Sequence, residues 1–355
     1  MTSGRSRLSG LGGYHSPQVP AEVRLNTNES PYPPPAAWQE DLAAAVAELE
    51  FHRYPDREAV ALRQGIASLH GVAPEEVFCA NGSNEVLQCL LLAYGGPGRR
   101  ALVFEPTYAL HAHIARLTST DVVTGPRTAD FRIETHVAGR LAAEELPDVA
   151  FVCSPNNPTG RLEDPAVVEL LLGAVGGLVV VDEAYGQFSR CSALELRHGD
   201  ATGADGLVVV RTFSKTWAMA AARLGYLVAD AEVVAGCEAA ALPYHLSAQT
   251  QAAGVLALRY RDEMARRVAL VAAERDRLAS GLADLPVESW PSDANFVLFR
   301  PRERDAPAVW KELLSAGVLV RDVSTRPGLE GCLRVTVGTP EENDRFLDAL
   351  ARSLA

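Results

Sequence analysis

The 355-residue sequence has no apolar run approaching the roughly 20 residues that a membrane-spanning helix needs. Its first residues, MTSGRSRLSGLGGYHSP, carry two arginines but lack the apolar core of a secretory signal. We therefore expect a cytoplasmic protein with no membrane partner.

Excess positive charge is also absent, since 45 acidic residues outnumber 33 basic ones and give a formal net charge of -12. An acidic surface repels a phosphate backbone, so nucleic acid is not an expected partner. A small phosphate ligand would have to be met by a few well-placed cations.

Paired cysteine and histidine motifs are missing as well. The six cysteines are scattered without a CxxC pair, which is typical of buried thiols in a reducing compartment. His111 and His113 lie close together but have no third ligand nearby, so we interpret them as ordinary residues and expect no metal site.

Short apolar runs alternate with helical patterns in the first two thirds of the chain. Val-rich runs predict buried strands at 101–106, 149–155, 177–185 and 206–215. Helix-like stretches lie at about 83–94, 108–117 and 164–173. The alternation predicts an α/β fold with a mostly parallel sheet sandwiched by helices. In such sheets ligands bind beyond the carboxyl ends of the strands.

Composition divides the chain into three predicted parts. Residues 1–36 are rich in Pro, Gly and Ser and predict an extended arm that packs with a small domain or with a partner subunit. Residues 37–245 hold the alternating pattern and predict the large domain. Residues 246–355 open with a long helical region to about 281, then short strands and helices, and predict a smaller α+β domain.

Lys215 begins a loop after the predicted strand VVVRTF, with Thr212 and Ser214 before it and Arg223 eight residues later. An amine, two hydroxyls and a guanidinium at one strand end could bind an aldehyde that carries a phosphate. A chance basic loop on the surface is the alternative.

The segment DEAY places Asp182 at the end of an apolar strand, where a carboxylate is costly unless it is paired. A protonated ring nitrogen would offset that cost, and Tyr185 could donate to a ring oxygen. A helix cap or a magnesium-binding acid is the alternative.

Two further segments follow predicted strands. SPNNPTG, at 154–160, predicts a rigid turn that presents an asparagine amide, and a plain structural turn is the alternative. NGSNE, at 81–85, opens a predicted helix, and the free N–H groups of a helix start can bind phosphate. Capping without a ligand explains that second segment equally well.

Taken in order, NPTG, DEAY and SKxxxxxxxR resemble fold-type I pyridoxal-phosphate aminotransferases. The likeness is closer still to the histidinol-phosphate aminotransferase family, through segments such as LNTNESPYPPP, FHRYPD, RTFSKTWAMAAARLGY and GCLRVTVG. It extends over nearly the whole chain.

The resemblance implies roles for individual residues. Lys215 would carry pyridoxal 5′-phosphate as a Schiff base, and Asp182 would pair with its ring nitrogen. Other cofactor contacts would come from the ring-binding and phosphate-binding residues Tyr185, Asn157, Tyr108, Ser83, Asn84, Thr212, Ser214 and Arg223.

The resemblance also implies a homodimer, because Tyr54 would reach the cofactor phosphate of the other subunit. Arg334 would grip the anionic group of the substrate, while Arg321 and Tyr14 match positions that contact a substrate phosphate. Asn157 would border the substrate as well.

The implied reaction is transamination from histidinol phosphate to 2-oxoglutarate, in histidine biosynthesis. Arg321 and Arg334 favour a phosphorylated donor, because guanidinium groups bind phosphate and carboxylate alike. The alternatives are an aromatic or specialised-metabolism aminotransferase on the same scaffold, an amino-acid-phosphate decarboxylase, and a cofactor-binding regulator.

Overall fold

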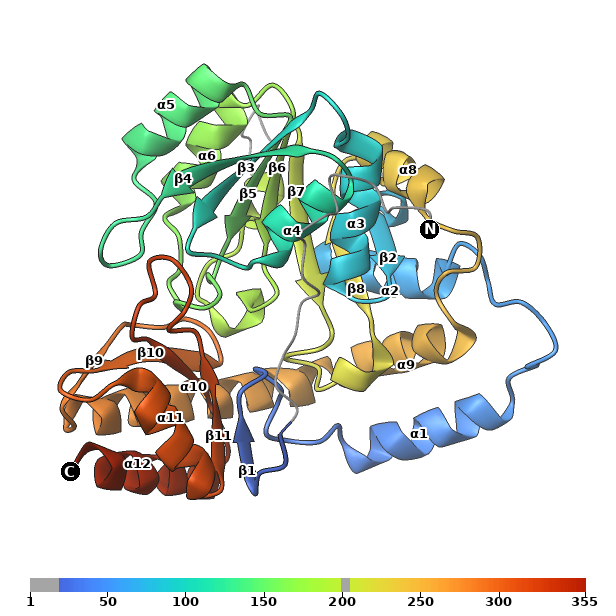
Figure 1. Cartoon of the computed structure of the whole chain (residues 1–355). Helices are drawn as coiled ribbons and strands as arrows, with labels where there is room; N and C mark the ends of the chain where they lie inside the picture. The colour runs from blue at the N-terminus through green and yellow to red at the C-terminus, as the bar shows by residue number, and fades with distance from the viewer. Residues whose placement is uncertain (1–18, 199–204) are drawn as a thin grey trace, which may run out of the picture.

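Two β-sheets organise the chain in the computed structural model, which describes residues 19–198 and 205–355. The larger sheet lies in the upper half of Figure 1 and the smaller in the lower half. The arrows of the central parallel strands run toward the smaller sheet, so that their carboxyl ends face it.

The larger sheet has seven strands, of which the central ones are parallel. Side by side, they are β2 (Val77–Ala80), β8 (Gly225–Val228), β7 (Leu207–Thr212), β6 (Leu178–Asp182), β5 (Val149–Cys153), β3 (Arg100–Glu105) and β4 (Asp121–Pro126). Only β8 runs antiparallel to its neighbours, β2 and β7. The predicted α/β fold with a mostly parallel sheet is confirmed.

Helices cover both faces of this sheet. They are α2 (Val60–His70), α3 (Ser83–Tyr94), α4 (Leu110–Leu117), α5 (Thr135–Glu145), α6 (Pro165–Ala174) and α8 (Ala231–Ala240). The short α7 (Glu195–His198) follows β6, and α1 (Ala36–Ala47) packs on α9 (Ala248–Leu258). Successive strand residues point to opposite faces. Val179 and Val181 therefore enter one apolar core and Val180 the other.

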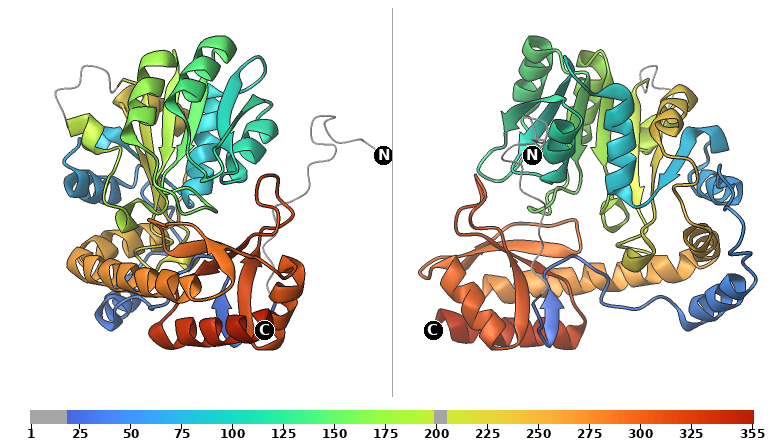
Figure 2. Two further views of the ribbon diagram at one scale, coloured as in Figure 1. Left: turned by 90° about the vertical axis from the view of Figure 1, so that its left-hand side faces the viewer. Right: turned by 45° about the vertical axis from the view of Figure 1, so that its right-hand side comes forward.

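The smaller sheet has five strands and joins the two ends of the chain. In order they are β1 (Val23–Leu25), β11 (Val318–Asp322), β12 (Leu333–Thr336), β10 (Phe296–Pro301) and β9 (Val287–Ser289). Helices α10 (Arg261–Ala283), α11 (Ala306–Ser315) and α12 (Pro340–Leu354) pack on it. Figure 2 shows β1, in blue, beside the red C-terminal elements.

The helical region expected over about 247–281 is two helices, α9 (Ala248–Leu258) and α10. Tyr260 leaves the helical conformation at φ -103° and ψ 24°. Its N–H bonds the carbonyl of Ala257, three residues back, and so closes a tighter turn that ends α9.

Within the two described stretches, no helix combines the length and apolarity that crossing a membrane requires. The division of the chain at residues 36 and 245 stays a prediction.

Candidate active site

A cavity of about 310 Å³ lies where the carboxyl ends of β5, β6 and β7 face the smaller sheet. All the predicted site residues except Tyr54 and Tyr14 line it. The N-terminal segment Asn26–Glu29, part of the LNTNESPYPPP stretch but assigned no role in the site from the sequence, forms a further wall. Segments more than 300 residues apart in sequence therefore meet at one place.

Lys215 follows β7 and is half-buried in this cavity. Its Nζ donates a hydrogen bond to the Thr27 carbonyl at 3.0 Å. Burial, with a smaller contribution from Arg334, lowers the pKa of Lys215 to about 8. With this pKa roughly a fifth of the amine is neutral near physiological pH, far more than for an ordinary lysine, and the neutral form is the one that a nucleophile or a base needs.

Asp182 ends β6 and is 1% exposed. Its Oδ1 accepts from the backbone N–H of Ala184 at 3.0 Å, and its Oδ2 lies 2.9 Å from His111 Nε2. A carboxylate has no proton to give, so Nε2–H of His111 is the donor. The aspartate is fixed by these two donors and presents its remaining lone pairs to the cavity.

His111 is therefore not the ordinary residue that the sequence suggested. Its ring stacks on Phe151 at 4.9 Å and meets the edge of Tyr108 at 5.4 Å. Sequence spacing gave no sign of this role, because Asp182 is 71 residues away and the contact needs β6 to lie beside β5.

Tyr185, Asn157 and Arg334 form a hydrogen-bonded row across the cavity. Arg334 Nη1 donates to Asn157 Oδ1 at 2.6 Å, and Asn157 Nδ2 donates to Tyr185 Oη at 3.4 Å. Burial raises the pKa of the Tyr185 phenol, which keeps the phenol protonated as a hydrogen-bond donor.

The start of α3 and the loop after β7 build an anion cradle. Helix α3 begins at Ser83 after Gly82, whose side chain cannot cap the free N–H groups. Arg223 approaches so closely that a Cβ on Gly82 would lie 2.5 Å from its Nη2. Ser214 Oγ lies 3.4 Å from Arg223 Nη1. A phosphate fits this set of N–H, hydroxyl and guanidinium donors.

Arg321 and Arg334 stand directly opposite each other in the antiparallel β11–β12 pair. Both side chains are largely buried, at 9% and 7% exposure, and both line the cavity. Like charges facing each other in a sheet are destabilising. An anion between them would offset that repulsion, so the pair predicts the place of an anionic ligand group.

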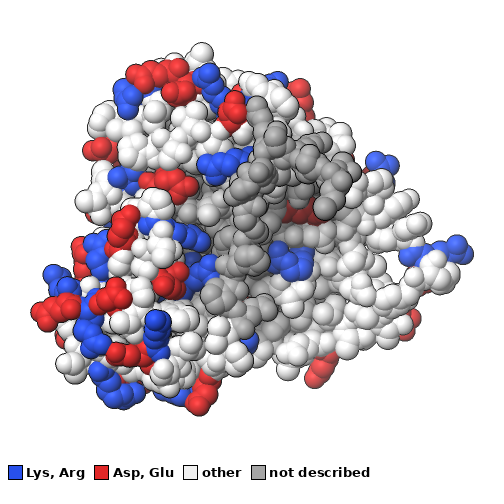
Figure 3. Space-filling view, viewed as in Figure 1, with Lys and Arg blue, Asp and Glu red and all other residues white. Residues whose placement is uncertain are grey.

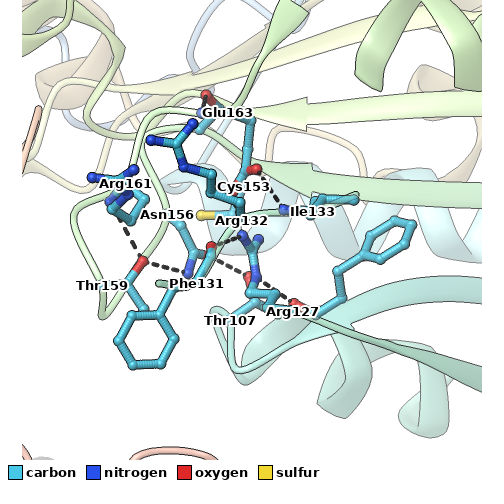
Figure 4. A network of polar contacts seen from close by, with 12 residues as sticks. Thr107, Arg127, Phe131, Arg132, Ile133, Cys153, Asn156, Thr159, Arg161 and Glu163 are labelled. Carbon is cyan, nitrogen blue, oxygen red and sulfur yellow. Dashed lines mark hydrogen bonds and ion pairs between the residues drawn. The ribbon is translucent and has the colours of Figure 1, made fainter. Parts of the chain in front are cut away.

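A buried network supports the turn that carries Asn157 (Figure 4). Arg127 pairs with Glu163, and the two side chains are 1% and 2% exposed. Arg127 also donates to the carbonyls of Phe104 and Phe131, at 2.8 and 2.9 Å.

The same network reaches the first residues of the turn. Glu163 accepts from the backbone N–H of Ile133 at 3.3 Å, and its own N–H donates to Ser154 Oγ at 3.1 Å. Asn156 accepts from Thr107 Oγ1 at 2.7 Å. The turn between β5 and α6 is thus held from several sides.

Two predicted residues lie elsewhere. Tyr54 is 80% exposed and stacks on Tyr244 at 4.5 Å, outside the cavity of its own chain. Tyr14 lies outside the described residues. Asn28, which the sequence did not single out, donates to Tyr185 Oη at 2.9 Å. Asn28 and His111 are connected to the site through their contacts with Tyr185 and Asp182, which no spacing rule could find.

The residues fit pyridoxal 5′-phosphate: a depressed-pKa lysine, a buried carboxylate, a phenol donor and a phosphate cradle line one cavity. The fold and this cavity define a pyridoxal-phosphate-dependent transferase of fold type I.

Comparison with known proteins narrows the class. The model of the aminotransferase class I and II family matches residues 20–350. The histidinol-phosphate aminotransferase of Frankia casuarinae is 48% identical over 367 residues, covering 99% of this chain and 90% of the relative. That of Thermobifida fusca is 49% identical over 353 residues, covering 98% and 94%.

Among solved structures, the histidinol-phosphate aminotransferase of Sinorhizobium meliloti in complex with pyridoxal-5′-phosphate has a similar fold. Its TM-score is 0.89 at 22% identity, covering 100% of this chain and 98% of that one. The chain belongs to the class I and II aminotransferases and, within them, to the histidinol-phosphate aminotransferase family.

Proposed function

We propose that this protein transfers the amino group of histidinol phosphate to 2-oxoglutarate, giving imidazole-acetol phosphate and glutamate. The observation that carries the choice of donor is the facing pair Arg321 and Arg334 beside Lys215. Two relatives that are 48% and 49% identical over nearly the full chain are named histidinol-phosphate aminotransferases, which supports this choice of donor.

Lys215 would hold the cofactor covalently through Nζ, while the start of α3, Thr212, Ser214 and Arg223 would bind its phosphate. Bound pyridoxal phosphate supplies an electron-accepting ring that makes the Cα–H of the amino donor acidic. Tyr108 would lie against the ring face, next to Asn84, to whose Oδ1 its hydroxyl donates at 3.0 Å.

The protein's own groups would then direct the protons. Asp182, fixed by His111 and the Ala184 N–H, would keep a proton on the ring nitrogen. Tyr185 would donate to the phenolic oxygen of the ring. The amine of Lys215, once displaced by the donor, would take the proton from Cα as a base and, as an acid, deliver it to the cofactor carbon that Nζ had held.

One site must accept a phosphate from the donor and a carboxylate from 2-oxoglutarate. Arg334 suits both, since a guanidinium fork can bind either anion through two hydrogen bonds. Arg321 adds the second positive charge that a dianionic phosphate calls for. Tyr14 stays a predicted further contact.

We also propose a homodimer in which Tyr54 reaches the cofactor phosphate of the partner subunit. The exposed fractions of the side chains of Phe51, Tyr54 and Leu242 are 67%, 80% and 78%, which is unusual for large apolar groups. Phe51 and Tyr54 border a groove next to α9, and Leu242 borders a second groove that shares Tyr244 with the first. The surface over α1 and α9 is mostly uncharged in Figure 3. A cytoplasmic location stays a prediction.

A panel of amino donors assayed with 2-oxoglutarate tests the proposal. Histidinol phosphate should give the highest kcat/KM, with a keto product and glutamate. Preference for an unphosphorylated aromatic amino acid would assign the chain to that neighbouring activity, and release of carbon dioxide would indicate a decarboxylase. Sedimentation with and without Tyr54 and Leu242 replaced by Ser tests the dimer.

A further inference from the structure

Asn28 is a polar residue at the centre of the site that neither the sequence nor the proposed reaction accounts for. It is 1% exposed and has φ +54°, a left-handed conformation that asparagine tolerates better than most residues. It lies just after β1, on the segment that forms one wall of the cavity.

Every polar group of Asn28 is engaged. Its backbone N–H donates to Thr336 Oγ1 at 3.0 Å, and its carbonyl accepts from Asn295 Nδ2 at 3.2 Å. Its Oδ1 accepts from Thr336 Oγ1 at 3.0 Å, and its Nδ2 donates to Tyr185 Oη at 2.9 Å.

Thr336 determines which way the Asn28 amide faces. The Thr336 hydroxyl oxygen accepts the hydrogen bond of the Asn28 backbone N–H. The hydroxyl proton of Thr336 needs an acceptor of its own, and Asn28 Oδ1 is that acceptor. A flipped amide would leave this buried hydroxyl, 3% exposed, without an acceptor among the described residues. Such an unsatisfied group is costly, and Nδ2 therefore faces Tyr185.

The consequence falls on the phenol of Tyr185. Its oxygen receives two N–H groups, from Asn28 at 2.9 Å and from Asn157 at 3.4 Å. In the part of the chain that the structure describes, no group accepts the proton of Tyr185. With both lone pairs filled by donors, that proton points into the cavity.

We propose that Asn28 is a positioning residue that orients the Tyr185 hydroxyl so that it can only donate into the cavity. The proposal rests on the proposed role of Tyr185 toward the cofactor's phenolic oxygen. An N–H donor on the phenol oxygen also strengthens the phenol as a donor, because hydrogen bonds in a chain polarise one another.

The same contacts link the substrate strand to the cofactor oxygen. Thr336 lies on β12, two residues after Arg334, so the strand that carries the anion-binding arginine also fixes the Asn28 amide. The N-terminal segment thus connects the smaller sheet to the ring end of the cavity.

The test measures the absorbance of the protein-bound cofactor against pH, which titrates the nitrogen joining Lys215 to the cofactor. Asn28→Gly removes the amide without backbone strain, because glycine adopts a positive φ freely. A weaker Tyr185 hydrogen bond stabilises the phenolic anion less, so the midpoint should rise by about 0.5 unit. Thr336→Val, which keeps the backbone and side-chain volume, should shift it in the same direction.

A double-mutant cycle with Tyr185→Phe makes the result specific. Tyr185→Phe alone should raise the midpoint, and adding Asn28→Gly should then change nothing, because the phenol through which Asn28 acts is gone. Ser30→Ala is the matched control, since Ser30 hydrogen-bonds Tyr32 within the same segment and, among the described residues, forms no hydrogen bond with Asn28.

The outcomes separate the two proposals. No shift from Tyr185→Phe would overturn the role of Tyr185 and, with it, this part of the proposed function. A shift from Tyr185→Phe without one from Asn28→Gly and Thr336→Val would overturn the inference alone. The inference would also be overturned if Ser30→Ala shifted the midpoint by as much as Asn28→Gly. The same holds if Asn28→Gly still shifted the midpoint in a protein that carries Tyr185→Phe.

Discussion

His111 Nε2 lies 2.9 Å from Asp182 Oδ2, and the side chains of the two residues are 0% and 2% exposed. The imidazole ring of His111 is itself stacked on Phe151, which restricts its rotation and so fixes the carboxylate of Asp182. The orientation of Asp182 therefore depends on a residue that does not itself line the cavity.

Replacing His111 by Phe keeps a ring on Phe151 but removes the donor to Asp182. We expect transamination kcat/KM to fall roughly 10- to 100-fold, since a buried acceptor that loses its partner is destabilised by about 1–3 kcal/mol. His113→Phe on the same helix is the control. Comparable losses in the two variants would contradict a specific role for His111.

Gly82→Ala should weaken cofactor binding, because the new Cβ would lie 2.5 Å from Arg223 Nη2. Gly98→Ala is a close control: its φ of +81° nearly equals the +79° of Gly82, but nothing lies within 4 Å of its Cβ. Both variants carry the backbone penalty, and only Gly82→Ala should raise the cofactor Kd, by roughly 10-fold or more. Equal Kd values would show that the cradle tolerates the methyl group.

The pKa of Lys215, lowered to about 8 by burial, predicts how the cofactor-free protein reacts with pyridoxal phosphate. Below that pH the amine is mostly charged and reacts slowly, and above it the amine is mostly neutral. The rate of borohydride-trapped labelling at Lys215 should therefore rise up to about pH 8 and level off about one unit higher.

The chain contains only one other lysine, Lys311, which is exposed and reports background labelling in the same digest. A rate at Lys215 still climbing steeply above about pH 10 would mean an unperturbed amine. Absence of any adduct at Lys215 would remove the basis of the proposed function.

Arg321→Ala should reduce kcat/KM roughly 10- to 100-fold with histidinol phosphate, because a charged hydrogen bond to a dianion is lost. The loss with an unphosphorylated aromatic donor should be much smaller. Arg326→Ala, in the loop after β11, is the control because Arg326 does not line the cavity. Equal losses for both donors would count against a phosphate beside Arg321.

Breaking the buried pair of Arg127 and Glu163 should destabilise the protein far more than breaking an exposed one. Arg127→Leu should lower the free energy of unfolding by about 3–5 kcal/mol, because it leaves Glu163 buried and unpaired. Arg140→Leu, in an exposed pair with Glu144 (56% and 55% exposed), should cost less than about 1 kcal/mol. In denaturant titrations, adding Glu163→Leu to Arg127→Leu should recover part of the loss.

The fold could be predicted largely because its central strands are Val-rich and buried on both faces. The apolar runs that form β5, β6 and β7 lie in the expected places. Strands β2 and β8 have only four residues each, and β4 has a mixed burial pattern, so none of the three stands out in the sequence.

Residues that would touch the ligand could be predicted from motifs, since a lysine, a carboxylate and a turn each follow a strand whose end is recognisable. Asn28 and His111 could not, because their partners Tyr185 and Asp182 are 157 and 71 residues away. The pairing of Arg321 with Arg334 likewise depends on the register of β11 on β12.

The hydrogen bond from the Asn28 N–H to Thr336 Oγ1 joins two residues that are 308 positions apart in sequence. During synthesis, the first wall of the cavity emerges from the ribosome long before the strand that must lock it. A growing chain can therefore form the large sheet early yet still be unable to capture its vitamin-derived cofactor. Acquisition of the cofactor would mark the completion of translation, and C-terminal truncations ending before β12 should be made as cofactor-free protein.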